Sequence, residues 1–316
     1  MKSLIHKVLE SPEFVEKPPV LIDVGASGAI HSYWQTIARH SICLAFDADD
    51  RELRVDEKGS SAFKKLLVFN SLVHPEVEGE LDFYLTKSPF CSGALPPDNK
   101  SLNDWAFGDK FDIVKTVKLK SITLNSALNR ANIEYVDWFK TDSQGLDLNL
   151  YLSMAENIRR NILLAEFEPG IIDAYQGEDK MFVTMQYMAA QPYWLAELKI
   201  KGSQKISRDE LELIANTPLR RKLLSYSHKT SPGWGEMLYI QNISAMEDRR
   251  SLLLGWVFAA VTGQYGFGIE IAKKGCILSN NLLFPELLQA SREAVTKLSF
   301  RRLLPVIIQK IQSLIK

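Results

Sequence analysis

Acidic residues stand at the ends of several apolar runs whose length and composition predict buried β-strands. These acids are Asp23, Asp47, Asp142, Glu166 and Glu168. Runs of this kind alternate with helix-sized segments, a rhythm typical of parallel sheets. Ligands of such sheets bind beyond the carboxyl ends of the strands. The acids are therefore expected to line one site, although each of them alone also suits a helix cap or an ion pair.

The turn after the first run reads Asp23-Val24-Gly25-Ala26-Ser27-Gly28-Ala29. Small residues allow a ligand to approach the backbone at the start of a helix. The turn lacks the G-x-G-x-x-G pattern of nicotinamide-binding proteins, and no P-loop lysine follows it. An acid two residues before the first glycine suits a ligand with a cationic amino-acid portion, such as the methionine end of S-adenosylmethionine (SAM). A tight turn without any ligand would also use small residues.

Asp47 follows the second predicted strand, roughly 20 residues beyond the glycine turn. An acid at this place can accept hydrogen bonds from both hydroxyls of a ribose. The alternative is a helix cap, because Ala48-Asp49-Asp50 has the composition of a helix start.

The run from Val136 ends in Lys140-Thr141-Asp142-Ser143-Gln144-Gly145. Lysine and aspartate resist burial unless they are paired or hydrated. We therefore expect Lys140 and Asp142 to face a cleft, with Gln144-Gly145 turning the chain into the next helix.

Composition limits the classes of function that the chain can have. The 316 residues are 46% hydrophobic and 24% charged, with 38 basic and 38 acidic side chains, so a chain devoted to nucleic acid is not expected. Cys43, Cys91 and Cys276 lie too far apart to indicate a disulfide framework or a metal centre. The first residues are a poor signal peptide, which indicates a cytoplasmic protein.

The predicted elements form a doubly wound, mostly parallel α/β sheet with a helical C-terminal extension. The predicted strands are residues 20–24, 42–46, 66–69, 81–85, 136–141 and 162–167, with 193–200 and 237–241 as closing antiparallel strands. A helix is expected after the glycine turn as far as Arg39, and residues 86–112 are expected to form a long loop. We therefore expect three parts: an N-terminal helical segment at residues 1–19, the sheet domain at 20–244 and the helical C-terminal extension at 245–316.

Two segments of the extension raise the question of a membrane. Residues 252–272 are apolar but contain Gln264, Glu270 and several glycines, which favours a helix packed in a core over a span. Residues 297–316 carry five basic residues and no acid. They predict a helix that packs on its own domain or on a second copy of the chain, or one that contacts an anionic membrane peripherally, at its inner face.

These motifs resemble those of the FkbM-type methyltransferases, a branch of the class I SAM-dependent fold. The family's first turn, aspartate-x-glycine-alanine-asparagine-x-glycine, is similar to residues 23–29, and its phenylalanine-acid-proline triplet to Phe46-Asp47-Ala48. Its most diagnostic run, lysine-x-aspartate-x-glutamine (or glutamate)-glycine, is matched by residues 140–145. Glu166-Phe167 and Tyr175-Gln176-Gly177 match two further motifs, and the likeness covers about residues 21–241.

The chain departs from the family pattern at four positions. Ser27 replaces asparagine, Ala29 replaces glycine, Ala48 replaces proline, and Asp147 stands where the family often has glutamate. The first two replacements keep the turn small, so the resemblance still implies SAM as the cofactor. The residues it implies for SAM binding are Asp23, Gly25, Ala26, Ser27, Gly28, Asp47 and Ala48.

The resemblance implies methyl transfer to a hydroxyl of a sugar, as part of a polysaccharide or glycan, or of a secondary metabolite. The reaction is an in-line displacement that requires no metal, and no cluster of histidine and cysteine indicates one. Asp142 is the first candidate for the base and Glu166 the second, while Lys140 would keep Asp142 ionised or orient the acceptor. The candidates for contact with the acceptor are Gln144, Trp105, His228 and Trp234.

Two other interpretations remain open. The chain could be a catalytically degenerate module of the same fold that binds SAM or a partner. It could also be a nicotinamide-dependent oxidoreductase, although the glycine pattern disfavours that enzyme class. No motif in the sequence identifies the acceptor. A homo-oligomer is also compatible with the sequence.

Overall fold

The computed structural model describes residues 1–26, 31–48, 62–279 and 282–314. The chain divides into two compact units. The terminal unit comprises Met1–Pro19, His31–His40 and Gln241–Lys316, and the sheet unit comprises Val20–Ile30 and Ser41–Ile240. All residues predicted to form the site belong to the sheet unit.

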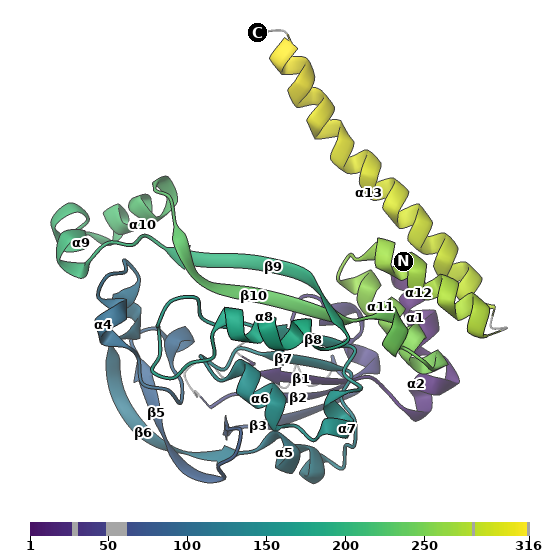
Figure 1. The fold of residues 1–316 in the computed structure, drawn as a ribbon, viewed down its shortest axis with the longest axis horizontal. Helices are drawn as coiled ribbons and strands as arrows, with labels where there is room; N and C mark the ends of the chain where they lie inside the picture. The colour runs from purple at the N-terminus through teal and green to yellow at the C-terminus, as the bar shows by residue number, and fades with distance from the viewer. Residues whose placement is uncertain (27–30, 49–61, 280–281, 315–316) are drawn as a thin grey trace. The chain divides into compact units, whose positions relative to one another are not determined.

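Among the described residues, the main sheet has seven strands in the order β3-β2-β1-β7-β8-β10-β9 (Figure 1). The strands are β1 (Val20–Val24), β2 (Ile42–Phe46), β3 (Lys65–Phe69), β7 (Trp138–Thr141), β8 (Leu164–Phe167), β9 (Tyr193–Ser203) and β10 (Ser231–Gln241). The strands from β3 to β8 in this order run parallel, and β10 runs antiparallel to β8. This is the strand order of class I methyltransferases, and it confirms the predicted Rossmann-like α/β class.

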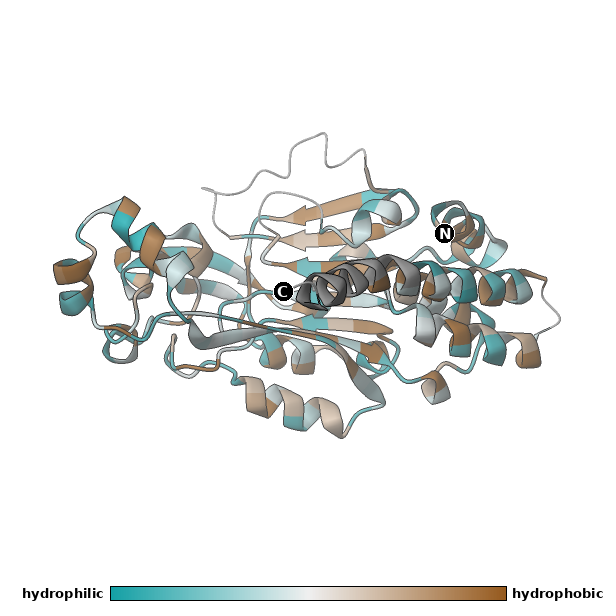
Figure 2. Ribbon diagram, turned by 90° about the horizontal axis from the view of Figure 1, so that it is seen from above, coloured by the Kyte–Doolittle hydropathy of each residue, from teal (hydrophilic) through white to brown (hydrophobic). Residues whose placement is uncertain are grey.

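One face of the sheet packs against four helices (Figure 1). These are α5 (Leu124–Ala131), α6 (Asp147–Ser153), α7 (Glu156–Arg159) and α8 (Met181–Ala189). Every second strand residue points to this face, so that Ile22, Phe139 and Phe167 are fully buried in one apolar core. The apolar strands are visible as brown ribbons in Figure 2. Burial on both sides explains why these strands are continuous apolar runs in the sequence.

A second, three-stranded sheet has the order β4-β6-β5. Its strands are β4 (Leu72–Val73), β5 (Gly79–Thr86) and β6 (Ile113–Ile122). The predicted strand at 81–85 therefore belongs to this sheet and not to the main one. The predicted loop at 86–112 connects β5 to β6, and it contains the short helices η3 (Pro89–Cys91), α4 (Asn99–Leu102) and η4 (Gly108–Phe111).

Strands β9 and β10 are neighbours in the sheet, as predicted, and both are longer than expected. The chain between them forms helices α9 (Arg208–Ile214) and α10 (Pro218–Ser227). Figure 1 shows these two helices beyond the ends of β9 and β10, at the left of the view. We call residues 207–229 the arm.

The terminal unit is helical. Its elements are α1 (Lys2–Leu9), α2 (Pro12–Glu16), η1 (Trp34–Thr36), η2 (Ala38–His40), η5 (Ile243–Ala245), α11 (Arg249–Val261), α12 (Tyr265–Leu278) and α13 (Leu283–Leu314). Ion pairs join its two ends, with Lys7 2.6 Å from Glu286 and Arg249 2.9 Å from Glu13. The predicted helix up to Arg39 is wrong over its second half, where two separate 3₁₀ turns occur.

The apolar segment 252–272 forms parts of two helices that are separated at Gly263, whose φ of 77° lies in the left-handed region. Residues of α11 from Leu252 to Ala260 are all buried, which confirms the predicted core helix. Within the described parts of the chain, no helix combines the length and the apolar character needed to cross a membrane. The predicted C-terminal helix is present as the end of α13, which continues through Pro305.

Candidate functional site

A cleft of about 720 Å³ lies at the carboxyl ends of β1, β2 and β7. Gly25, Asp47 and Ala48 line it, as do Asp142 and Gln144 from the turn after β7. Apolar side chains complete the wall, and they include Phe46, Leu72, Val73, Phe83 and Phe90. We call this cleft the first cavity. Its mixed polar and apolar lining is typical of a small-molecule site.

A tight backbone contact shapes the first cavity at Gly25. Its φ of 79° is left-handed, and a Cβ atom there would lie 2.4 Å from the carbonyl oxygen of Asp142. The amides of Gly25 and Ala26 both donate to the carbonyl of Phe46 at 3.0 Å, and the amide of Asp142 donates to the carbonyl of Val24 at 2.9 Å. Glycine is thus required where the ends of β1 and β7 meet.

A second cavity, with about 800 Å³ of empty space, lies beside the first. Its wall combines aromatic rings with carboxyl groups. The aromatic residues are Phe90, Phe107, Phe111, Tyr175 and Trp234, and the acids are Asp142, Glu168, Glu178 and Glu236. Lys180 pairs with Glu178 at 2.7 Å, and Lys201 lies 3.2 Å from Glu236.

Three residues line both cavities, namely Phe90, Asp142 and Gln144. The side-chain amide of Gln144 donates to Oδ1 of Asp142 at 2.5 Å. The Tyr175 hydroxyl lies 2.6 Å from Oε1 of Gln144 and 2.9 Å from the carbonyl oxygen of Cys91. Because Tyr175 fixes which end of the Gln144 amide faces Asp142, the three side chains form a chain of hydrogen bonds that orients the Asp142 carboxyl group.

The turn that holds this chain has an unusual backbone. Gln144 has a φ of 58°, which residues other than glycine rarely adopt, and Gly145 follows with a φ of 109°. Asp147 stabilises the turn by accepting hydrogen bonds from the hydroxyl of Thr141, from the amide and hydroxyl of Ser143, and from the amide of Glu168. Strained residues of this kind cluster at functional sites.

The predicted charges inside the strands lie elsewhere. Lys140 donates to Asp23 at 2.7 Å. Its pairing partner on the adjacent strand β8 is Glu166, which accepts a hydrogen bond from the Trp138 indole at 2.7 Å. The three charged groups form a row across β1, β7 and β8, on the sheet face opposite to Phe139 and Phe167. None of the three contributes to the wall of either cavity.

Burial separates the pKa values of the two acids that follow β7 and β8. Burial raises the pKa of Asp142 to about 6, against the opposing effect of the Lys140 ammonium group. Burial raises the pKa of Glu168 to about 9, and the negative charge of Asp142 adds to this increase. At neutral pH, Asp142 is then mostly ionised and Glu168 is mostly protonated. Two carboxyl groups with separated pKa values can share acid and base roles.

Within the strand row, burial raises the pKa of Glu166 to about 7. Burial alone would lower the pKa of Lys140, but the Asp23 carboxylate outweighs this effect and holds the pKa above its ordinary value. Lys140 therefore stays charged and compensates the buried acid beside it.

The structure brings together some of the predicted residues and separates others. Gly25, Asp47, Ala48, Asp142 and Gln144 share the first cavity, and Trp234 lines the second. Ala26 is next to Gly25 without lining the cavity, while Ser27 and Gly28 lie outside the described residues.

Two predicted contacts with the acceptor, Trp105 and His228, do not line either cavity. Trp105 is 6% exposed and stacks on Phe107, with Lys205 5.7 Å above its ring. His228 is exposed at the end of α10. Among the described residues, no group of three or more His, Cys, Asp or Glu side chains is arranged to hold a metal ion.

Sequence reasoning grouped Glu168 with the acids expected at the site and placed Tyr175 in a family motif, but it gave neither residue a specific role and did not single out Glu178. All three residues line the second cavity. For Glu168 a signal exists, because an acid directly after a strand and before Pro169-Gly170 sits where the chain leaves the sheet. For Glu178 no sequence signal exists. Its closeness to Gly145 and Gly170 is visible only in the folded structure.

Comparisons with protein-family models, with curated proteins and with solved structures found no match for this chain.

Proposed function

We propose that this protein is a SAM-dependent O-methyltransferase. The observation that carries the proposal is the pair of adjoining cavities at the carboxyl ends of a sheet with class I methyltransferase strand order, with Asp142 in the wall of both. Such an arrangement suits a two-ligand reaction in which a group passes from one cavity to the other.

The first cavity fits the chemistry of SAM. Asp47, which follows β2 and lines this cavity, can accept hydrogen bonds from the ribose hydroxyls. Phe46, Leu72 and Val73 offer apolar surface for the adenine ring. Asp142 lines this cavity beside Gly25, and its negative charge complements the sulfonium cation.

The second cavity suits a hydroxylated acceptor such as a sugar or a secondary metabolite. Aromatic rings such as those of Phe107 and Trp234 can stack on the apolar face of a sugar ring. Carboxyl groups such as Glu236 can accept hydrogen bonds from its hydroxyl groups. The combination supports an acceptor that is both polar and ring-shaped.

When bound, SAM supplies a methyl group on a positively charged sulfur. The chain's own task is to hold the acceptor oxygen in line with that methyl carbon, because in-line placement accounts for much of the rate. Asp142, ionised at neutral pH, accepts the proton of the acceptor hydroxyl as the new carbon–oxygen bond forms and the carbon–sulfur bond breaks. Glu168, still protonated, donates a hydrogen bond within the second cavity and so orients the acceptor.

The first test is calorimetric titration of the purified protein with SAM. Wild type should bind, and Asp47→Ala should weaken binding at least about tenfold, because a hydrogen bond to a charged group contributes about 1.5–3 kcal/mol. Asp82→Asn is the matched control, since Asp82 is an exposed acid on β5 that pairs with Lys118 and lines neither cavity.

The control should bind SAM as wild type does. A folded wild-type protein that does not bind SAM would reject the proposal. Equal weakening by Asp82→Asn would show that the effect comes from overall charge and not from the first cavity.

A further inference from the structure

Helix α10 presents an apolar face to solvent. None of its residues is buried. Leu219, Leu223 and Tyr226 are 68%, 58% and 79% exposed. Their spacing of four and then three residues puts all three on one side of the helix. We call these three side chains the arm face. A contiguous exposed apolar face on a soluble protein marks an interaction surface.

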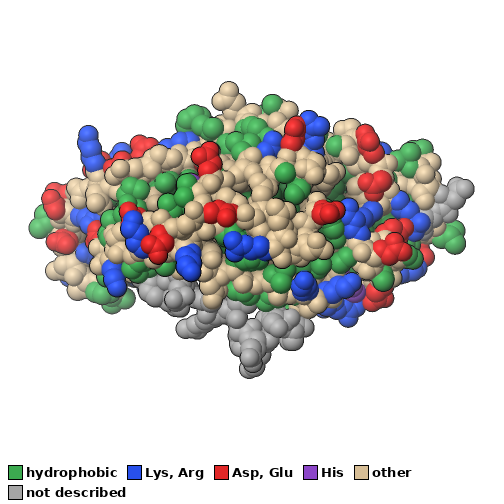
Figure 3. Space-filling view, turned by 90° about the horizontal axis from the view of Figure 1, so that it is seen from below, with side chains coloured by type: hydrophobic (Ala, Val, Ile, Leu, Met, Phe, Trp, Pro, Cys, Tyr) green, Lys and Arg blue, Asp and Glu red, His purple; other side chains and the backbone are tan. Residues whose placement is uncertain are grey.

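The charges next to the arm face are basic. Arg220 and Lys222 lie on α10, and Lys229 follows it, whereas residues 213–229 contain no acid. Lys222 is three residues from Leu219 and four from Tyr226, so it borders the arm face directly. The acids of the arm are Asp209, Glu210 and Glu212, all on α9. The surface drawn in Figure 3, in contrast, has basic and acidic side chains interspersed.

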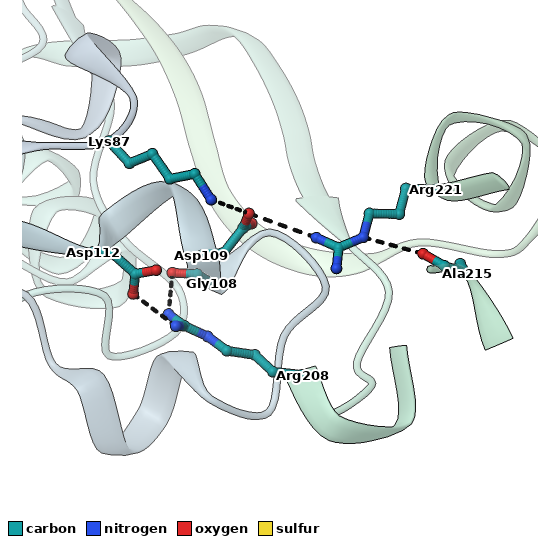
Figure 4. A network of polar contacts seen from close by, with 7 residues as sticks. All are labelled: Lys87, Gly108, Asp109, Asp112, Arg208, Ala215 and Arg221. Carbon is teal, nitrogen blue, oxygen red and sulfur yellow. Dashed lines mark hydrogen bonds and ion pairs between the residues drawn. The ribbon is translucent and has the colours of Figure 1, made fainter. Parts of the chain in front are cut away.

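A polar network holds the arm against η4 (Figure 4). Arg208 pairs with Asp112 at 2.6 Å and also donates to the carbonyl of Gly108. Arg221 lies 3.6 Å from Asp109, which Lys87 contacts at 3.0 Å, and its Nε donates to the carbonyl of Ala215 at 3.1 Å. The side chains of Arg208 and Arg221 both point toward η4 and the residue that follows it, so they anchor the arm. Leu219, Leu223 and Lys222 are absent from this network, and so is Arg220, which donates to Asn216 within the arm at 3.4 Å. These side chains lie on the exposed helix and can meet an outside partner.

We propose that the arm face docks on a membrane surface that contains anionic lipid. An apolar face bordered by cations is the pattern of a helix that lies in the lipid interface. A second copy of the chain fits less well, because a twofold contact through the arm face would bring Lys222 toward its own counterpart. A helical peptide partner usually needs a groove, whereas the arm face belongs to a helix without any buried residue.

The test is co-sedimentation of the full chain with vesicles. Phosphatidylcholine vesicles with about 30 mol% phosphatidylglycerol provide the anionic surface, and pure phosphatidylcholine vesicles provide the neutral one. Wild type should bind the anionic vesicles more tightly, with binding that weakens as salt increases. The Leu219→Glu/Leu223→Glu double variant should bind at least about tenfold more weakly, since it places charge on the inserted face.

A matched control carries the same change of charge at other exposed apolar side chains. Val114 and Phe182 are 69% and 68% exposed on β6 and α8, so Val114→Glu/Phe182→Glu should bind as wild type does. Circular dichroism should show both double variants folded. The proposal is overturned if the wild type does not bind the anionic vesicles or if the arm-face variant binds them as tightly as the wild type does. It is also overturned if both double variants lose vesicle binding to the same extent.

Discussion

Replacing Asp142 by asparagine should stabilise the protein at neutral pH. Burial raises the pKa of this carboxyl group from 3.8 to about 6 in the folded chain. Between these two pH values the unfolded chain has already lost the proton, while the folded chain still holds it. The free energy of unfolding therefore falls as pH rises through this window, and the lost stability is not regained above it. Asparagine is neutral at every pH and avoids this loss.

The size of the gain follows from the shift. About two pKa units at about 1.36 kcal/mol each give an upper value of roughly 3 kcal/mol. Asp142 is only partly buried at the cavity wall, so solvent screening reduces the gain. We expect Asp142→Asn to add about 1–3 kcal/mol to the free energy of unfolding at about pH 7.5 and to add almost nothing below about pH 4.

Urea unfolding of wild type and variant across this pH range measures the difference. Asp147→Asn is the contrasting variant: burial raises the pKa of Asp147 as well, but this carboxyl group accepts four hydrogen bonds, which the substitution would disturb. An amide nitrogen there would face a donor, and we expect a loss of at least about 2 kcal/mol. A gain at Asp142 that persists unchanged at low pH would refute the reasoning, and so would a gain of equal size at Asp147.

Three further predictions concern the two cavities. Initial rates of methyl transfer should rise through about pH 6 as Asp142 ionises and fall through about pH 9 as Glu168 loses its proton, and Glu168→Gln should remove only the fall. Tyr175→Phe frees the Gln144 amide to rotate, so the rising limb should move to higher pH. The dissociation constant for SAM, measured by calorimetry at a pH above this limb where Asp142 is ionised in both proteins, should stay constant. An unchanged limb would contradict the proposed orientation of Asp142. Gly25→Ala should lower the free energy of unfolding, measured with urea, by several kcal/mol, because the new Cβ atom would clash with the Asp142 carbonyl. Gly177 has a similar left-handed φ but no neighbour within 4 Å, so Gly177→Ala should cost only about 1–3 kcal/mol of backbone strain.

The parallel strands could be predicted because both of their faces are buried, which leaves continuous apolar runs such as residues 20–24 and 42–46. Strand β5 was recognisable as a strand, but its place in a separate sheet was not. Its pairing with β6 spans about thirty residues and depends on long-range contacts that no local pattern displays.

Strand alternation contained information on the acids that the prediction did not use. Phe167 and Glu166 are adjacent in β8 and must point to opposite faces. Since Phe167 lies in the core with the helices, Glu166 has to share the other face with its neighbour Lys140. The second cavity was beyond such reasoning, because Glu168, Tyr175 and Trp234 converge on it from distant segments.

The common wall of the two cavities has a consequence for how their ligands bind. Phe90, Asp142 and Gln144 face both sides, so an occupant of one cavity changes the charge or position of groups that the other occupant touches. Such coupling is reciprocal, because each ligand alters the affinity of the other by the same factor. A cation in the first cavity would keep Asp142 ionised, and its replacement by a neutral molecule would favour proton uptake. Under the proposed function, the wall would therefore link occupancy of one cavity to affinity in the other and to the protonation of Asp142.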